Sequence, residues 1–351
     1  MTDLHKGEPF SHDVIIVDGL WGSGKSILSS LIGSFEGVEK KRIDHIFEYI
    51  AVGASLGKVS ADFAKAMINI YADLDQYNNL VGREVNLRFN DDSGFRNTPG
   101  SIRYLKRLIG GEGDSVVTAI NEQNLALLLV THHVTGVCGP LFESLKGRLH
   151  LIEVIRHPLQ LVNYWTTYLE SFERSREFTL GTQVASCRVP WFALKWIDEF
   201  MAMGPIDRAI RSIYEMQTAP SPISVSGTDI GVGSTLKPIL TVAFEHLVGN
   251  THEVLQQVSQ YLDRSPTKFT RRAIRRQKVP RQLSSQGKAS NPMSWLPNPR
   301  LTYEEQLNLL RQQIGAQASA GSIFLLDTAI KNYEQRLLTL SESLHIRGCI
   351  S

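Results

Sequence analysis

The sequence of 351 residues is poor in cysteine, nearly balanced in charge and without long apolar runs. Its three cysteines, Cys138, Cys187 and Cys349, lie far apart and show no Cys-x-x-Cys or Cys/His spacing. That pattern disfavours a zinc site or a disulfide framework and favours a reducing compartment. No segment approaches the ~20 apolar residues of a membrane helix, and residues 1–13 lack the apolar centre of a signal peptide. We therefore expect a cytoplasmic protein with no membrane partner.

Positive and negative charges almost cancel, since 37 Lys and Arg residues face 35 Asp and Glu residues for a formal net charge of +2. This balance disfavours a general nucleic-acid coat protein. Basic residues are nevertheless concentrated locally: eight of the 18 residues from 264 to 281 are Lys or Arg, and none is acidic. Such a run predicts either a solvent-exposed helix face or an anion-binding segment.

Short apolar runs separated by helical stretches indicate the fold. Four of them have the length and character of buried strands: Val14–Val17, Leu125–Val130, Leu149–Ile155 and Leu240–Phe244. We expect an α/β fold of three layers, with a central, mainly parallel sheet flanked by helices. One domain over residues 1–351 suits the length better than two, with helical insertions at about 37–110 and 166–220.

A phosphate-binding loop follows the first predicted strand. Residues 19–26, Gly-Leu-Trp-Gly-Ser-Gly-Lys-Ser, fit the pattern G-x-x-x-x-G-K-S and precede a predicted helix over Lys25–Ile32. Glycines let the backbone fold around an anion with its N–H groups pointing inward, and the helix N-terminus adds its dipole. The alternative is a chance glycine-rich turn, which the strand and helix on either side disfavour.

The magnesium half of a nucleotide hydrolase or kinase site is hard to find. Such enzymes place an acidic residue at the end of a second strand. Here the run ending at Val130 is followed by Thr131-His132-His133, and the run ending at Ile155 by Arg156-His157-Pro158. Asp327 follows an apolar run, but late in the chain and inside a predicted amphipathic helix, where it is expected to face solvent.

The order of these strand ends resembles a known family. A phosphate loop, then Thr-His after a strand, then Arg-x-Pro after the next, is the order in sulfotransferases that use 3′-phosphoadenosine 5′-phosphosulfate (PAPS). Residues 244–247, Phe-Glu-His-Leu, resemble the aromatic–acid–acid–Leu turn of that family, and the basic loop from Arg281 to Lys288 is similar to its late phosphate-clasping loop. The resemblance covers roughly two thirds of the chain, in order.

The resemblance implies a P-loop fold and the transfer of a sulfuryl group from PAPS, in line, to a hydroxyl or amine of a small-molecule or carbohydrate acceptor. The product would be adenosine 3′,5′-bisphosphate, and no metal is obligatory. The two insertions would shape the acceptor pocket, and a basic loop over about 264–299 would cover the cofactor. Nucleic acid is not an expected partner, and a homo-oligomer is possible.

The resemblance also implies roles for cofactor-binding residues. Gly22, Ser23, Gly24, Lys25 and Ser26 would hold the 5′-phosphosulfate, with Trp21 near the adenine or packed on the first helix. The family commonly has Lys-Ser-Gly-Thr-Thr here, so the lysine has moved, and the string equally fits a nucleotide kinase.

At the other end of the nucleotide, the resemblance gives the 3′-phosphate to Arg156, whose guanidinium suits bidentate contact. A surface ion pair at a strand end is the alternative. Asn163 and Tyr164 stand where the family often has a serine, and Arg281, Gly287 and Lys288 would close over the phosphate.

Two residues are candidates for the general base. His132 occupies the Thr-His position, and imidazole can accept a proton near neutral pH. A strand-end histidine that caps a loop is the alternative, and His133 would point the other way in an extended chain. Glu48 is the rival base, although its surroundings favour an ordinary solvated helix face.

Two other functions stay open. Gly24-Lys25-Ser26 also fits an ATP-dependent P-loop kinase, and the basic run 264–281 also fits a nucleotide-binding regulatory or nucleic-acid-associated protein.

Overall fold

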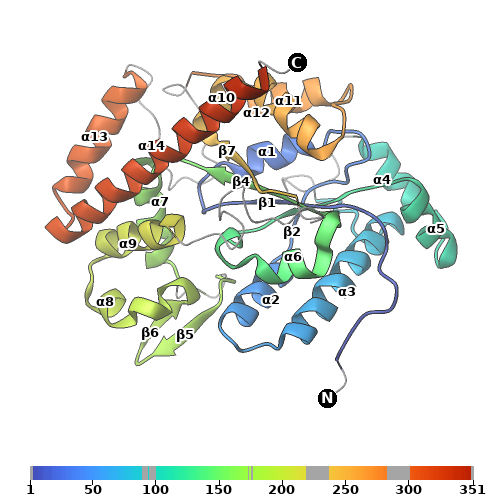
Figure 1. The fold of residues 1–351 in the computed structure, drawn as a ribbon, viewed down its shortest axis with the longest axis horizontal. Coiled ribbons are helices and arrows are strands. Elements are labelled where there is room, and N and C mark those ends of the chain that lie inside the picture. The colour runs from blue at the N-terminus through green and yellow to red at the C-terminus, as the bar shows by residue number, and fades with distance from the viewer. Residues whose placement is uncertain are drawn as a thin grey trace.

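The centre of the structure is a sheet of five strands that all run parallel (Figure 1). The computed structural model describes residues 3–88, 94, 100–172, 174, 177–218, 237–282 and 301–348. The strand order is β2-β3-β1-β4-β7. The strands are β1 (Val14–Asp18), β2 (Arg42–Ile43), β3 (Leu127–Val130), β4 (Leu149–Ile155) and β7 (Leu240–Ala243). The predicted α/β fold with a central parallel sheet is confirmed.

All four strands predicted from apolar runs are present, with ends that shift by two residues at most. β1 lies at the centre of the sheet and is buried along its whole length, which its run of apolar, β-branched residues favours. The fifth strand, β2, was not predicted. It is only two residues long, and it forms because Arg42 and Ile43 pair with the end of β3.

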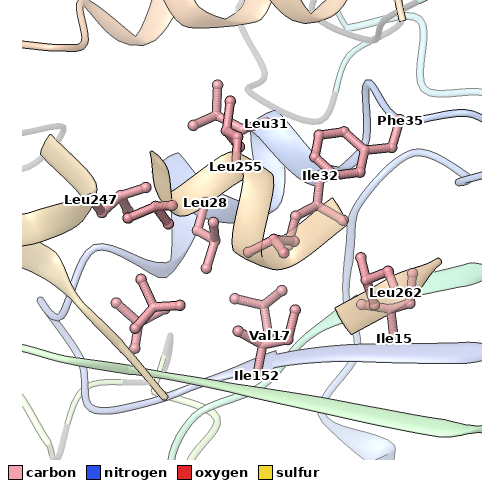
Figure 2. Packing of buried hydrophobic residues seen from close by; sticks show 14 of the residues in the cluster. Ile15, Val17, Leu28, Leu31, Ile32, Phe35, Ile152, Leu247, Leu255 and Leu262 are labelled. Atoms are coloured by element: carbon pink, nitrogen blue, oxygen red, sulfur yellow. The ribbon is translucent and has the colours of Figure 1, made fainter. Parts of the chain in front are cut away.

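One face of the sheet is covered by α1 and by helices from the second half of the chain. These are α1 (Lys25–Ile32), α10 (Phe244–Gly249), α11 (Thr251–Leu262) and α12 (Thr270–Gln277). Figure 2 shows Leu28, Leu31 and Ile32 of α1 above Val17 and Ile152 of the sheet. The predicted helix Lys25–Ile32 is confirmed, and this packing holds its N-terminus at the end of β1.

The other face is covered by helices from the first half of the chain. They are α2 (Ile46–Ser55), α3 (Ala61–Leu80) and α6 (Gly139–Leu145), with α4 (Ser101–Arg107) and α5 (Asp114–Glu122) beyond the sheet edge (Figure 1). Phe47 of α2 is fully buried against this face. The neighbouring Glu48 is buried too.

A third group of helices packs beside the sheet around an aromatic core. Its helices are α7 (Leu159–Glu170), α8 (Ile197–Ala202), α9 (Pro205–Thr218), α13 (Tyr303–Gly315) and α14 (Ala320–Gly348). Trp165 of α7 is fully buried in this core. An antiparallel hairpin of β5 (Gly181–Val184) and β6 (Cys187–Pro190) adjoins it and was not predicted, because β5 is mostly polar and exposed. Within the described ranges, no helix has both the length and the apolarity needed to cross a membrane.

The layer between α1 and the sheet should be sensitive to lost volume. Leu28→Ala removes a side chain with no exposed area, so we expect it to lower the free energy of unfolding by ~2–5 kcal/mol. Leu338→Ala, in a helix but with a side chain 66% exposed, should change it by less than ~0.5 kcal/mol. Urea unfolding followed by tryptophan fluorescence measures both, and equal losses would contradict this packing.

Candidate active site

The functional side chains meet where the parallel strands end. The loop Gly19–Ser26 follows β1, residues Thr131–His133 follow β3, Arg156 follows β4, and Phe244 follows β7. In parallel sheets of this kind, ligands bind at the carboxyl ends of the strands. The structure therefore brings the predicted phosphate loop, the predicted base and the predicted phosphate-binding arginine to one edge.

The phosphate loop needs its glycines. Gly19, Gly22 and Gly24 have φ values of 142°, 84° and 100°, a region that side chains disfavour. A Cβ at Gly19 would lie 2.3 Å from the carbonyl oxygen of Val154, and one at Gly24 would lie 2.3 Å from the ring of Phe244. The loop is thus pressed against β4 on one side and the start of α10 on the other.

Lys25 is folded into this loop. Its Nζ donates to the carbonyl oxygen of Gly19, and to that of Leu20 at 3.1 Å. Burial lowers the pKa of Lys25 from 10.5 to about 8, although the negative charges of Asp18 and Glu48 oppose this shift. Lys25 forms no ion pair with any described residue, so its charge is available to an anion in the loop.

One acidic strand end escaped the sequence analysis. Asp18 is the last residue of β1 and is fully buried. Its carboxylate accepts from the hydroxyl of Thr131 at 2.8 Å and from both the backbone N–H, at 2.8 Å, and the hydroxyl of Thr135. Asp18 therefore ties β1 to the segment after β3 and has a structural partner for each oxygen.

Arg156 is partly buried beside the loop and is not part of a surface ion pair among the described residues. Its Nη1 donates to the carbonyl oxygen of Gly22 at 2.8 Å, its Nε donates to Gln160 at 3.2 Å, and its guanidinium lies 4.1 Å from the ring centre of Phe244. Burial lowers its pKa, and the charge of Glu245 opposes this. Within the described part of the chain, no carboxylate forms an ion pair with it.

Glu245, next to Phe244, fastens the C-terminal helices to this edge. It accepts from the backbone N–H of His157 at 3.2 Å, from the hydroxyl of Tyr303 at 3.0 Å and from that of Tyr333. Burial and the charge of Glu245 raise the pKa values of both tyrosines above their ordinary range. Both oxygens of this carboxylate are therefore hydrogen-bonded to tyrosines of α13 and α14.

Arg281 lies close enough to Arg156 for its positive charge to lower the pKa of Arg156. Its backbone N–H donates to the carbonyl oxygen of Val248 at 2.8 Å. Gly287 and Lys288 lie outside the described residues. Arg264, at the start of the run, is paired with Asp13 at 2.7 Å. The other six basic residues are exposed on α12 or next to its ends: Lys268, Arg271, Arg272, Arg275, Arg276 and Lys278.

Glu48 and His132 are partners rather than rivals. The expectation of a solvated helix face for Glu48 was wrong, since its exposed fraction is 7%. Its Oε1 accepts from the backbone N–H of His132 at 2.9 Å and lies 2.9 Å from Nδ1 of that ring. Hydrogen bonds from His132 and His45 outweigh burial and lower the pKa of Glu48. An ionised carboxylate only accepts, so Nδ1 carries the proton and Nε2 of His132 is left as the basic nitrogen.

His45 is a further member of this group that the sequence analysis did not single out. Its Nδ1 lies 3.2 Å from Oε2 of Glu48. His45, Glu48 and His132 place possible metal-ligand atoms within 4.8 Å of one another. The two rings are nearly parallel, at 17° with centres 5.4 Å apart. A shared ion would have to lie in the plane of both rings, so the arrangement suits hydrogen bonds to Glu48 better than a metal.

Trp21 covers the base. Its ring stacks on His132, with centres 4.8 Å apart, and on Tyr168 at 4.9 Å. The indole of Trp165 donates to the carbonyl oxygen of Trp21 at 3.1 Å. Trp21 thus packs against α7, and not on the first helix.

Tyr164, also from α7, lies against the loop, since a Cβ on Gly22 would come within 3.3 Å of its ring. The Asn163 carbonyl oxygen accepts from Thr167 one turn later. The ring of Tyr164 therefore borders the loop, and the roles of Asn163 and Tyr164 at the 3′-phosphate stay predictions.

His133 does not continue as an extended chain, so the expected direction of its side chain was wrong. Its φ is 57°, and its backbone N–H donates to the carbonyl oxygen of Gly19 at 3.2 Å. It lines a small cavity together with Ser23 and Arg156. Burial lowers the pKa of His133 to about 4, so the ring is neutral near pH 7. The buried Ser23 hydroxyl has no hydrogen-bond partner among the described residues.

Comparison with known proteins gives matches among solved structures alone. No protein-family model and no curated protein sequence matches the chain. The sulfotransferase domain of the Synechococcus PCC 7002 olefin synthase is 12% identical, with a TM-score of 0.39, covering 92% of this chain and 96% of that one. The sulfotransferase domain from the curacin biosynthetic pathway is 10% identical, with a TM-score of 0.38 and coverages of 91% and 98%. Sulfotransferase STF9 from Mycobacterium avium is 12% identical, with a TM-score of 0.38 and coverages of 88% and 77%.

These similar structures are all sulfotransferases. That is the family which the sequence motifs resemble. Since the identities are 10–12% and the TM-scores 0.38–0.39, the chemistry of this chain has to be argued from its own residues.

The burial of Lys25 makes stability depend on pH. Its pKa of about 8 in the folded chain lies below the ordinary value of 10.5, so between these values the unfolded chain binds more protons and stability rises with pH. Compared with Lys25→Met, which has no such proton, the wild type should gain up to ~3 kcal/mol as the pH rises from about 7.5 to about 10.5. Urea unfolding of both proteins across this range measures the gain. A constant difference between them would mean that Lys25 keeps its ordinary pKa.

Proposed function

We propose that this protein is a sulfotransferase that moves a sulfuryl group from PAPS to a hydroxyl or amine of a small-molecule or carbohydrate acceptor. The observation that carries the proposal is a pair of cations, the buried Lys25 and the partly buried Arg156. Both contact backbone carbonyls of the phosphate loop, and neither is neutralised by a carboxylate among the described residues.

Buried charges are costly unless an opposite charge meets them. The neutral oxygens of Gly19, Leu20 and Gly22 satisfy hydrogen bonds but leave both positive charges in place. A ligand with two separate anionic groups would compensate both at once. Adenosine 3′,5′-bisphosphate and PAPS have this character, and Lys25 would hold the 5′ end while Arg156 and Arg281 hold the 3′-phosphate. When bound, PAPS supplies the sulfuryl group.

The Glu48–His132 pair supports transfer to an acceptor group that must lose a proton. Nε2 of His132 would take the proton of the acceptor's hydroxyl or amine as its oxygen or nitrogen bonds to sulfur. Glu48 would hold the ring in the tautomer that leaves Nε2 basic and would stabilise the imidazolium that forms. Lys25 would offset the negative charge that develops on the transferred group and the leaving phosphate oxygen.

The ATP-dependent kinase is the less favoured reading, because the carboxylates at this edge are already engaged. Asp18 is bonded to two threonines, Glu245 to two tyrosines, and Glu153 on β4 to Arg336. After β3, where a magnesium-organising acid would be expected, the chain has His132. A regulatory or nucleic-acid-associated protein has only the exposed face of α12 in its support.

Ligand binding should separate these functions. By isothermal titration, adenosine 3′,5′-bisphosphate should bind without metal and more tightly than either adenosine 5′-monophosphate or ATP with magnesium. Arg156→Gln removes a guanidinium from the 3′ end, so the preference for bisphosphate over monophosphate should shrink by ~10–100-fold, the worth of a charge-assisted contact. Arg272→Gln, on the exposed face of α12, is the matched control. A preference for ATP with magnesium would overturn the proposal, as would salt-dependent nucleic-acid binding without affinity for bisphosphate.

Turnover should depend on His132 more than on Glu48. His132→Gln should lower the rate of bisphosphate formation from PAPS, over a panel of aryl, alkyl and sugar acceptors, by ~10²–10⁴-fold. Its affinity for adenosine 3′,5′-bisphosphate should change little. Glu48→Gln, which keeps the shape of the side chain, should cost less. If Glu48→Gln abolishes turnover while His132→Gln retains it, Glu48 is the base and His132 is not.

A further inference from the structure

The carboxylate that orients the base is held on its other side by His45. Glu48 presents Oε1 to His132 at 2.9 Å and Oε2 to His45 at 3.2 Å. Glu48 is the least exposed of the three side chains, with a side-chain exposed fraction of 9%, between His132 at 15% and His45 at 31%. The contacts form a row from the phosphate loop to the surface.

The two histidines are also fixed by ring stacking. His45 lies between Tyr49, with centres 6.0 Å apart, and His132, at 5.4 Å, and Phe178 leans on it at 6.4 Å. The Tyr49 hydroxyl donates to the carbonyl oxygen of Phe178 at 2.6 Å. Because these contacts hold the His45 ring in place, its Nδ1 remains directed at Glu48.

We propose that His45 is a positioning residue, which holds Oε2 of Glu48 and thereby fixes the orientation and the Nδ1–H tautomer of His132. This rests on the proposed function in one respect, since His132 is taken to be its base. His45 itself does not touch the reacting groups. It acts through Glu48, because a bond to Oε2 holds the plane of the carboxylate more firmly than the contacts of His132 with Oε1 alone would.

His45 also bears on the charge of the base. The groups that act on His45 are Glu48, Asp44 and Glu177, and its hydrogen bond with Glu48 raises its pKa. The groups that act on His132 are Lys25, Glu48 and His45. Burial, Lys25 and His45 lower the pKa of His132, while Glu48 raises it. A protonated His45 therefore opposes protonation of His132 in two ways. Its positive charge repels a second one, and its hydrogen bond with Glu48 weakens the pull of that carboxylate on His132.

Loss of His45 should raise the pKa of His132. Without His45, the carboxylate of Glu48 acts on His132 alone and no cation lies beside it, so the pKa of His132 rises. Protonated His132 cannot accept the acceptor's proton. The acid limb of the pH profile of kcat/KM should therefore move to higher pH, with the plateau at high pH nearly unchanged.

The test compares two substitutions at His45 with one control. His45→Ala removes the contact, His45→Asn keeps an N–H donor without the charge, and His252→Ala changes an exposed histidine of α11. In ¹⁵N-labelled protein without ligand, NMR reports the tautomer and titration of the His132 ring. For His45→Ala we expect mixed tautomers, a higher pKa of the His132 ring and a loss of ~10-fold in kcat/KM on the acid side. His45→Asn should keep the Nδ1–H tautomer, and His252→Ala should match the wild type.

The outcomes separate this inference from the proposed function. If His132 shows the same tautomer and pKa in His45→Ala as in the wild type, His45 is not a positioning residue, whatever the protein transfers. If the NMR changes appear but no adenosine 3′,5′-bisphosphate binds, the positioning role stands and the sulfotransferase proposal falls. If kcat/KM falls equally at every pH with no change in His132, the effect of His45 is on packing alone, and the inference is overturned.

Discussion

Two positive charges beside the phosphate loop, on the buried Lys25 and the partly buried Arg156, are the constraint around which this molecule is arranged. Removing a cation from water costs free energy unless polar groups replace the water. Here those groups include carbonyl oxygens of the loop itself. The loop can turn those carbonyls inward because Gly19 and Gly24 adopt conformations that side chains disfavour, in places where a Cβ has no room. The result is a loop that satisfies hydrogen bonds and leaves charge uncompensated.

The acidic residues nearby leave that charge unpaired, because their carboxylates are hydrogen-bonded to other groups. Asp18 ties β1 to the segment after β3, and Glu245 ties α13 and α14 to the ends of β4 and β7. Glu48 holds the ring of His132. Each carboxylate stabilises the architecture around the phosphate loop without forming an ion pair with Lys25 or Arg156. In a chain of almost no net charge, the contacts that stabilise the fold are therefore separate from the two cations proposed to hold an anion.

Features that depend on neighbours in sequence could be predicted, and features that depend on distant contacts could not. β1, the loop and α1 follow from a local pattern of β-branched residues, glycines and a helix start, and β4 was predicted to the residue. Glu48 was misjudged because it lies 84 positions from His132 along the chain. Nothing in its own helix shows that its carboxylate packs against the segment after β3. His133 was misjudged because a left-handed turn after β3 cannot be read from Thr-His-His. The roles assigned to Gly287 and Lys288 stay predictions.

The loop sequence taken alone does not decide between sulfuryl and phosphoryl transfer, and the structure shows why its neighbours matter more. Gly24-Lys25-Ser26 supplies an anion site that either reaction can use. What differs is the next strand end. A carboxylate there would bind magnesium and suit a nucleoside triphosphate, whereas His132, oriented by Glu48 and covered by Trp21, suits removal of a proton from an acceptor. With Arg156 placed for a second anionic group, the same loop would form one half of the proposed site for a nucleotide with two anionic groups. The chemistry is therefore set by residues that the fold brings to the loop, and not by the loop itself.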